Sequence, residues 1–379
     1  MHAPLPSAYR IEWRALASLE DIHDAWHGLA ARALEPNVFY EPAFARNAAP
    51  VFGADAGVVL VWSALGRLMG MFPGRLMRWR GGPGRTLTGW THPYAPLGVP
   101  LVDRDEAEAV ITAWLDHLAS DRAMPALLML PMVPEQGAFA TALDAVLLRS
   151  KRPAQAFDRH RRALLAPGAQ RAGYLDRSVS AGRRKELRRQ RRRLQEIAPV
   201  TFTTATGESE LAPALKDYLV IEASGWKGLA GTAAVSDPKV RSFLEGAVTA
   251  LAAEGKARVH RLFLNGRAIA ASITLNSGPA AWCWKITYSE GLARSSPGVQ
   301  LALDVTETLL GDPSVTRVDS CATADHPMID RIWLERMELS DRLIAVKPLL
   351  IPFRLACRAE ALRRAALHAA KRLKQRLGR

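Results

Sequence analysis

The feature that most constrains this sequence is a set of three apolar, strand-like segments joined by two tight turns. Segments 257–264 and 267–275 flank Asn265-Gly266, a dipeptide that supplies the positive φ angles of a type I′ hairpin turn. Ser277-Gly278-Pro279 then turns the chain into a third segment, 280–289. The pattern predicts an antiparallel three-stranded meander.

Helices and further strands are predicted on both sides of this meander. Ser296-Pro297-Gly298 opens one helix, because serine can cap a helix and proline suits its first position. The flanking elements are predicted at 200–204 (strand), 210–223 and 237–254 (helices), 297–310 (helix), 316–321 (strand), 327–336 (helix) and 342–346 (strand). Residues 200–348 therefore form one α/β pattern.

The first half of the chain repeats this order weakly. Its elements are predicted at 9–13 (strand), 21–33 and 42–52 (helices), 57–64 and 67–72 (hairpin), 105–119 (helix), 126–130 (strand), 137–148 (helix) and 154–165 (strand). A length of 379 residues also suits two domains of about 150 to 180 residues. The economical interpretation is a degenerate tandem repeat.

Basic residues exceed acidic ones by 51 to 37, a net charge of +14, and two segments carry much of the surplus. Segment 183–193 holds eight basic residues and a single Glu186; it could bind coenzyme phosphates, an acidic lipid-linked acceptor or RNA, or be merely solvated. Segment 354–379 is predicted to be an amphipathic helix that lies on anionic lipid, docks on its own domain or pairs with a partner. Its apolar stripe is Leu355, Ala359, Leu362, Ala366, Ala370, Leu373 and Leu377.

Other features limit the class of protein. No apolar run approaches the roughly 18 residues that a spanning helix needs, and the first residues lack the layout of a signal peptide. The three cysteines, Cys283, Cys321 and Cys357, form no C-x-x-C pair. We therefore expect a cytoplasmic protein without a structural metal.

Four short motifs carry a family resemblance: WKGLAGTA at 226–233, GRAIAASITL at 266–275, KITY at 285–288 and SPG at 296–298. With the element order, they resemble the BioF2-like acetyltransferase domain of cellulose-biosynthesis (CelD-like) proteins. This domain belongs to the GNAT superfamily and is similar to the Fem-type peptidyltransferases, which carry two tandem GNAT-like halves.

The resemblance implies an α/β (α+β) fold class: tandem GNAT-like domains with mixed, mostly antiparallel sheets flanked by helices, plus a basic C-terminal helix. The domains implied are a degenerate N-terminal GNAT-like domain (1–165), a basic connecting helix (166–199), a C-terminal GNAT-like acyltransferase domain (200–348) and a basic amphipathic helix (349–379). The implied donor is acetyl or acyl coenzyme A as a co-substrate, and Fem-type relatives use aminoacyl-tRNA instead.

The resemblance also implies a donor site at the start of the helix that follows the meander. GNAT enzymes typically present R/Q-x-x-G-x-G/A there, and its N–H groups bind the coenzyme pyrophosphate. Here Arg294-Ser295-Ser296-Pro297-Gly298-Val299 departs from that pattern, because Pro297 has no N–H and the second glycine is absent. A helix N-terminus still favours phosphate. The predicted donor-binding residues are Lys285, Arg294, Ser296, Gly298 and Val299.

The candidate catalytic residues are Tyr288, Asp319 and His326, because acyl transfer needs a base, a donor to the carbonyl and an acid for the thiolate. Asp325 is more simply a helix cap. The predicted substrate-binding residues are Trp226, Lys227, Thr232, Arg183, Lys185 and Arg188. Strand alternation places Trp282, Trp284, Ile286 and Tyr288 on one face of the third meander strand and Cys283, Lys285 and Thr287 on the other.

The function predicted from sequence is transfer of an acetyl or acyl group from coenzyme A to an amine or hydroxyl of a polysaccharide or cell-envelope precursor, at the inner membrane face. One alternative is a Fem-like transferase whose basic run binds tRNA, and another is a non-catalytic GNAT-like binding module at the membrane surface. A thiol hydrolase using Cys321 and His326 carries little weight, since five residues across a strand end rarely align both side chains.

Overall fold

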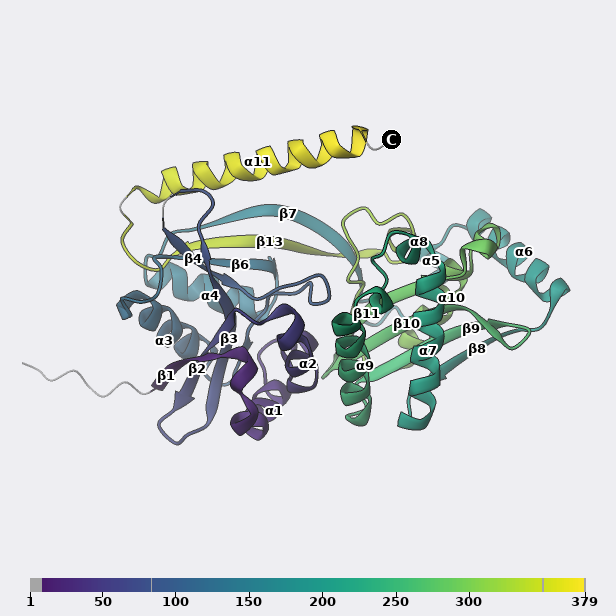
Figure 1. Cartoon of the computed structure of the whole chain (residues 1–379), viewed down its shortest axis with the longest axis horizontal. Coiled ribbons are helices and arrows are strands. Elements are labelled where there is room, and N and C mark those ends of the chain that lie inside the picture. Colours follow the sequence, from purple (N-terminus) through teal and green to yellow (C-terminus); the bar gives the residue numbers. More distant parts are fainter. Residues whose placement is uncertain (1–8, 83, 350, 378–379) are drawn as a thin grey trace, which may run out of the picture. The chain divides into compact units, whose positions relative to one another are not determined.

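The computed structural model describes residues 9–82, 84–349 and 351–377 (Figure 1). The chain divides into two compact units: unit 1 holds the segments up to Asn37, 53–160 and from Glu338, and unit 2 holds Val38–Phe52 and Arg161–Met337. The chain passes between them inside strands β7 (Ala154–Leu165) and β13 (Glu335–Ala345). The predicted domains are consecutive along the chain, whereas these units interleave, so the predicted boundaries stay a prediction.

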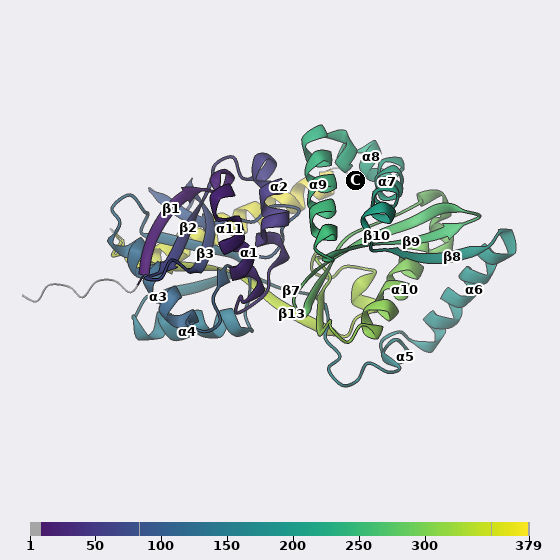
Figure 2. The same ribbon diagram turned by 90° about the horizontal axis from the view of Figure 1, so that it is seen from below.

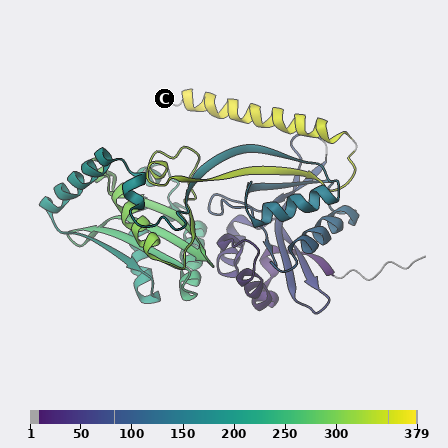
Figure 3. The same ribbon diagram turned by 180° about the vertical axis from the view of Figure 1, so that it is seen from behind.

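Unit 1 contains a mixed sheet with the strand order β1-β2-β3-β4-β6-β13, and β5 pairs with β3. The described pairs are antiparallel except β4 with β6. Helices α3 and α4 lie over one face of this sheet (Figure 3). The elements are β1 (Tyr9–Ala15), α1 (His23–Ala31), β2 (Ala56–Ser63), β3 (Leu68–Arg78), β4 (Arg85–Gly89), β5 (Leu101–Val102), α3 (Ala107–Ser120), β6 (Leu127–Pro134), α4 (Ala138–Arg149) and α11 (Phe353–Leu377).

Unit 2 contains a second mixed sheet with the order β8-β9-β10-β11-β12-β7, in which β11 and β12 are parallel and the other described pairs are antiparallel. Helices α7 and α9 cover one face, and α10 and α6 cover the other (Figure 2). The elements are α2 (Pro42–Phe52), α5 (Tyr174–Ser178), α6 (Ala181–Ile197), β8 (Val200–Ala205), α7 (Glu208–Ser224), α8 (Trp226–Leu229), α9 (Pro238–Ala253), β9 (Ala257–Leu264), β10 (Arg267–Ser277), β11 (Ala280–Tyr288), α10 (Pro297–Gly311) and β12 (Arg317–Asp319).

Each half of the chain ends in a strand that continues into the other unit. Strand β7 ends the first half, yet Leu164 and Leu165 pair with β12 in unit 2. Strand β13 ends the second half, and from Leu339 onward it pairs with β6 in unit 1. The predicted α/β class, with mixed and mostly antiparallel sheets flanked by helices, is confirmed, and the predicted C-terminal helix forms α11; residues 378–379 lie outside the described part.

The predicted meander is confirmed as β9, β10 and β11, which pair antiparallel in sequence order. Asn265 and Gly266 adopt φ angles of 51° and 71°, the left-handed conformation that a type I′ turn needs at both central positions. Asparagine tolerates this conformation and glycine has no Cβ to oppose it. The local turn chemistry therefore sets the register of the hairpin.

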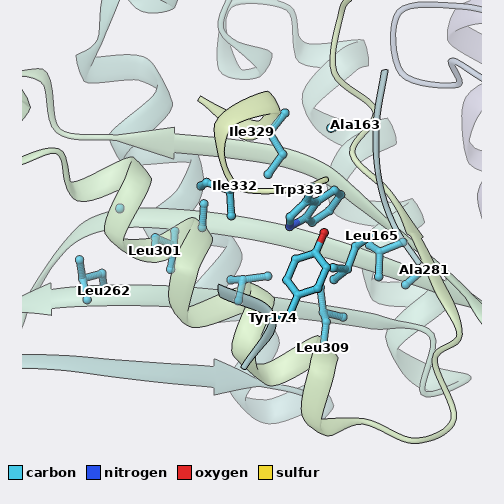
Figure 4. Close-up of a cluster of buried hydrophobic side chains, with 14 of the residues drawn as sticks. Ala163, Leu165, Tyr174, Leu262, Ala281, Leu301, Leu309, Ile329, Ile332 and Trp333 are labelled. Atoms are coloured by element: carbon cyan, nitrogen blue, oxygen red, sulfur yellow. The ribbon is translucent and has the colours of Figure 1, made fainter. Parts of the chain in front are cut away.

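The helix predicted at 327–336 is wrong. Only a 3-10 turn, Ile329–Arg331, forms there, and β13 already begins at Glu335. Ile329, Ile332 and Trp333 are buried in the core on the α10 side of unit 2 (Figure 4). A single helical turn is enough to place these three side chains on one side of the segment, so their spacing does not require a longer helix. Arg336 then donates to the carbonyls of Asp330 and Trp333.

Three local predictions also need correction. Ser296 has left-handed backbone angles (φ 49°, ψ 49°) and its side chain makes no capping bond, because capping requires an extended N-cap residue. Asp325 has a φ of 55° and precedes no regular α-helix, so it caps none. The segment after Gly225, which lies between the helices predicted at 210–223 and 237–254 and for which no element of its own is predicted, forms the short helix α8.

Candidate functional site

A pocket of about 510 Å³ lies in unit 2, where strand β11 ends and helix α10 begins. Helix α8, the end of β11, the first turn of α10 and the segment around His326 form its walls. Seven residues singled out from sequence line this one pocket: Trp226, Lys227, Tyr288, Ser296, Gly298, Val299 and His326. The fold therefore brings together donor-side, acceptor-side and catalytic candidates.

The other predicted site residues do not line this pocket. Lys285 and Asp319 lie on strands β11 and β12, and Arg294 and Thr232 are exposed. Arg183, Lys185 and Arg188 are exposed on α6, where Arg188 lines a different pocket between α5, α6 and α10. Their binding and catalytic roles stay predictions.

A β-bulge in β11 changes which side chains share a face. Ile273 pairs with Lys285 and Thr274 with Cys283, so Trp284 is the extra residue. Such a bulge reverses the alternation of the residues that follow. Trp284 packs on Phe44 and Phe243, whereas Ile286 packs on the cluster beneath α10.

The predicted alternation along β11 is therefore wrong beyond Trp284. Tyr288 follows Ile286 toward α10, and its ring lies beside Gly298. Lys285 lies with Trp284, its ammonium 5.6 Å from the indole centroid, within electrostatic range of Glu222 and Lys227. The bulge thus sorts Tyr288 and Lys285 onto opposite sides of the sheet.

Lys227 reaches the pocket as one half of an ion pair. Its Nζ lies 2.7 Å from Oε1 of the buried Glu222. The Glu222 carboxylate also accepts the Tyr218 hydroxyl (3.0 Å) and the N–H of Ala234 (2.9 Å). Burial would raise the pKa of Glu222, but Lys227 and these donors outweigh it and hold the pKa below its usual value.

Glu222, the buried partner of Lys227, is not among the site residues predicted from sequence. It sits at the end of α7 among apolar positions, five residues before Lys227. A carboxylate in a buried helical stripe needs a cationic partner, and that signal could have identified the pair. Glu290 lines the pocket directly: its Oε1 accepts the N–H of Trp226 at 2.7 Å and holds the start of α8.

The donor side predicted from sequence corresponds to the first turn of α10. The first intrahelical bond is donated by Gln300 to the Ser296 carbonyl (3.0 Å), so the N–H groups of Gly298 and Val299 precede the ladder. A Cβ on Gly298 would lie 2.8 Å from Cδ1 of Tyr288. Glycine therefore permits the Tyr288 ring to lie against the helix start, where free N–H groups favour an anion.

His326 is arranged as a hydrogen-bond donor. Its Nδ1 accepts the N–H groups of Met328 (3.3 Å) and Ile329 (3.5 Å). An accepting Nδ1 in a neutral imidazole places the proton on Nε2. In this arrangement the ring can donate from Nε2 to a carbonyl oxygen, but it has no free lone pair with which to act as a base.

Asp319 is held away from the pocket by a buried ion pair. Its carboxylate accepts a hydrogen bond from Arg162, whose side chain is fully buried, and another from the N–H of Cys321 at 2.9 Å. Burial, aided by the Asp319 charge, raises the pKa of Cys321 well above its usual value. The thiol therefore stays protonated, which disfavours the thiol-hydrolase interpretation.

Lys285 is expected to destabilise unit 2 at neutral pH. Burial, with the nearby Lys227 charge, lowers its pKa to about 8, so the folded state releases a proton that the unfolded state retains up to about pH 10.4. Lys285→Met should therefore raise the free energy of unfolding by about 3 kcal/mol at pH 7. The gain should shrink as the pH rises above 8.

Hydrogen exchange of the β11 amides in the full chain, at several pH values between 7 and 10, measures this gain. Lys239→Met, at an exposed position in α9, is the matched control and should show no such trend. A Lys285→Met effect that does not vary with pH would contradict the prediction.

The family comparison is consistent with this geometry. Residues 181–326 match the acetyltransferase (GNAT) domain family. A comparison with curated proteins finds no match to this sequence.

Several solved structures share the fold. The C-terminal domain of a putative lysylphosphatidylglycerol synthetase from Agrobacterium fabrum is 12% identical, with a TM-score of 0.56 over 92% of this chain and 97% of that one. A crystal structure of FemX is 9% identical, with a TM-score of 0.55 over 85% and 95% of the two chains. A conserved protein of unknown function from Bacteroides thetaiotaomicron is 10% identical, with a TM-score of 0.53 over 89% and 100%.

At these identities the structural likeness concerns the fold alone. It extends over most of the chain, in agreement with the tandem GNAT-like class predicted from sequence, and the match over 181–326 contains the bulged strand, the first turn of α10 and His326. Residues 181–326 therefore match the acetyltransferase (GNAT) domain family, and the chain has a mixed α/β, GNAT-like fold.

Proposed function

We propose that this chain transfers an acetyl or acyl group from coenzyme A to an amine or hydroxyl of a polysaccharide or cell-envelope precursor. The observation that carries the proposal is the pocket lined by Trp226, Lys227, Tyr288, Gly298 and His326. The pocket contains the N-terminus of α10, which favours phosphate. It also contains side chains that can donate hydrogen bonds and the carboxylate of Glu290, close to the end of β11.

The donor would bind with its phosphates at the first turn of α10. The N–H groups of Gly298 and Val299 and the helix dipole favour an anion there. Pro297 contributes no N–H, so this turn offers fewer donors than the usual GNAT loop, and the exposed Arg294 is the nearby cation proposed to compensate. The residues at this turn could therefore bind a pyrophosphate, such as that of coenzyme A acting as a co-substrate.

The reacting carbonyl would lie along β11, beyond the end of its pairing with β12. Strand β12 pairs with Ala280–Trp282, so the proposed N–H donors belong to residues farther along β11. These groups and the Nε2–H of His326 could stabilise the oxyanion that forms when the acceptor attacks. Such preorganised donors are typically worth about 2.7–4 kcal/mol each in catalysis.

Proton transfer would use two further polar residues of the pocket. Glu290 is the lining carboxylate and is our candidate to take the proton from the attacking amine or hydroxyl. When the tetrahedral intermediate collapses, the carbon–sulfur bond breaks and the thiolate takes a proton, for which Tyr288 is the candidate donor. The ion-paired Lys227 and the exposed Trp226 would face the acceptor.

The test is a titration of acetyl coenzyme A, followed by thermal shift and calorimetry, on the full chain and on Gly298→Trp. The added side chain must displace Tyr288 and fill the helix start, so we expect donor affinity to fall at least about tenfold, or 1.4 kcal/mol. Gly311→Trp is the matched control, because Gly311 ends the same helix and a Cβ added there would meet nothing within 4 Å.

The comparison of the two tryptophan variants decides the matter. Equal binding by Gly298→Trp and Gly311→Trp would show that the donor does not occupy this pocket. Retained binding by wild type with no acyl transfer to any amine or sugar acceptor would instead favour a non-catalytic binding module.

A second candidate is a Fem-like transferase that takes its acyl group from aminoacyl-tRNA. One observation favours it: α6 presents an exposed basic face remote from its buried residues Leu187 and Leu194. Within this face Arg189 forms a surface pair with Glu186, and such a row of cations suits a phosphate backbone. The face consists of Lys185, Arg188, Arg189, Arg192 and Arg193.

Binding of tRNA measured over a range of salt concentrations separates the two candidates. A steep salt dependence, reduced in Lys185→Glu/Arg188→Glu/Arg192→Glu, would support the aminoacyl-tRNA route. Affinity for acetyl coenzyme A with no salt-dependent tRNA binding would support the first.

A further inference from the structure

Helix α11 leaves part of its apolar stripe exposed. Leu355 is 47% exposed and Leu362 is 72% exposed, and Ala366 continues the stripe one turn later. These residues, spaced by seven and four, lie on one side of the helix. The exposed arginines Arg354 and Arg358 flank the stripe.

The opposite side of α11 is fastened to unit 1. Phe353, Ala356 and Cys357, with Ala359 of the stripe, pack in a cluster with residues of β6 and β13. One turn farther, the buried Glu360 and Arg364 lie on the same side of the helix. The docked side of α11 therefore has an apolar contact with unit 1 in its first turn and a polar contact one turn later.

An ion cluster closes this polar contact. Arg364 donates to Asp341 (2.8 Å) and Glu360 (2.7 Å) and pairs with Asp158. Arg363 also donates to Glu360 at 2.9 Å. Burial would raise the pKa of Glu360, but the two arginines outweigh it and lower the pKa, and the carboxylates raise the pKa of Arg364. The charges on this side are thus neutralised within unit 1.

This orientation is unusual for an amphipathic helix, which ordinarily buries its apolar stripe against its own core. Because the ion cluster fixes the rotation of α11, the leucines stay outward while the helix remains docked. The segment Phe353–Leu377 carries eight basic residues and one acidic residue, and Glu360 already pairs with Arg363 and Arg364. The exposed stripe is therefore set in a strongly cationic surface.

We propose that this stripe is a docking surface for an anionic lipid bilayer. Leu355, Leu362 and Ala366 would enter the headgroup region, and Arg354 and Arg358 would contact lipid phosphates. Charge complementarity favours a bilayer over an uncharged protein groove. Among the described residues no helix is long and apolar enough to cross a membrane. The proposal is independent of the reaction that the pocket performs.

Vesicle co-sedimentation of the full chain tests this surface. We expect wild type to bind vesicles of phosphatidylcholine mixed with phosphatidylglycerol, to bind pure phosphatidylcholine at least about tenfold less, and to be released by added salt. Leu355→Glu/Leu362→Glu should bind the mixed vesicles at least about tenfold less than wild type. The variant lacks the two leucine side chains whose burial in the bilayer would favour binding.

The matched control is Leu148→Glu, at a helical position in α4 of the same unit that is 82% exposed. It adds negative charge to a similarly exposed leucine without touching α11, so its vesicle binding should equal wild type. Because all substituted positions are exposed, circular dichroism and thermal unfolding should match wild type in every variant.

Several results would overturn the proposal. They are equal binding to neutral and anionic vesicles, equal loss of binding in Leu148→Glu, and a dimer of wild type that dissociates in Leu355→Glu/Leu362→Glu while vesicle binding is absent. The last result would assign the stripe to a second copy of the chain.

Discussion

Asp319→Ala is expected to lower the free energy of unfolding of unit 2 by about 3–5 kcal/mol. The substitution leaves the guanidinium of Arg162, whose side chain is fully buried, without the carboxylate that balances its charge. It also removes the acceptor of the Cys321 N–H. Hydrogen exchange of the β11 and β12 amides is the suitable measurement, because a chain of two units need not unfold in one step.

A double substitution separates the loss of the pair from the cost of an orphaned charge. Arg162→Met/Asp319→Leu replaces both ions by apolar side chains, so it should recover a large part of the stability that Asp319→Ala loses. Glu245→Ala is the surface control: its pair with Arg241 is exposed, so its loss should cost at most about 0.5 kcal/mol. A loss in Asp319→Ala no greater than this control would contradict the buried-pair account.

The same variants test the catalytic role predicted for Asp319. If Asp319 acts only through the ion pair, Arg162→Met/Asp319→Leu should retain acyl transfer in proportion to its folded fraction. An activity loss in a stably folded Arg162→Met/Asp319→Leu would instead support direct participation of the carboxylate. Stability and activity therefore have to be measured on the same preparations.

Acidification is expected to destabilise unit 2 through His260. This residue is fully buried in β9, where its Nδ1 and Nε2 lie 3.0 and 3.2 Å from the hydroxyls of Thr204 and Thr274. Burial, with the nearby Arg258 charge, lowers the pKa of His260 to about 3. The folded state therefore holds a neutral ring at a pH where the unfolded state takes up a proton.

The sign of the effect follows from these two pKa values. Above pH 6.5 both states are neutral and His260 makes no pH-dependent contribution. Below pH 6.5 only the unfolded state is protonated, so the free energy of unfolding falls by about 1.4 kcal/mol per pH unit until about pH 3. Over three units the expected loss is about 4 kcal/mol.

Comparison with His260→Gln isolates this contribution from those of the other histidines. Glutamine can still bond to both threonine hydroxyls but does not titrate, so the variant should lack this part of the acid loss, whatever its stability at pH 7. His27→Gln, at an exposed position of α1, should leave the pH profile as in wild type. If the free energies of unfolding of wild type and His260→Gln changed in parallel between pH 6.5 and 4, the prediction would be wrong.

The local sequence was sufficient to predict an element wherever a single turn or a regular spacing of apolar residues determines that element. Asn265-Gly266 specified the β9–β10 hairpin, and α2, β7 and β9 have the predicted bounds, because turn chemistry and apolar spacing act over neighbouring residues. The same logic failed at 327–336, where the helical spacing of Ile329, Ile332 and Trp333 is satisfied by a single turn.

The candidate site was predictable in part for the same reason. The bulk of the pocket comes from segments that the motifs of residues 226–233, 285–288 and 296–298 identify directly, so seven predicted residues meet there. Glu222 was not predicted because its role depends on an ion pair with Lys227, which lies beyond the end of helix α7. The side of the sheet that Lys285 and Tyr288 occupy was mispredicted, since a bulge is a property of strand pairing.

The sequence by itself determined the α/β class, the meander, the helix start at Ser296-Pro297-Gly298 and the two basic segments, because these depend on nearby residues and composition. Only the tertiary structure decided which strand joins which sheet, how the bulge rotates the end of β11, and that the ion cluster around Arg364 turns the leucines of α11 outward. Each of these depends on contacts between residues distant in the chain, and periodicity along one segment carries no information about the partner.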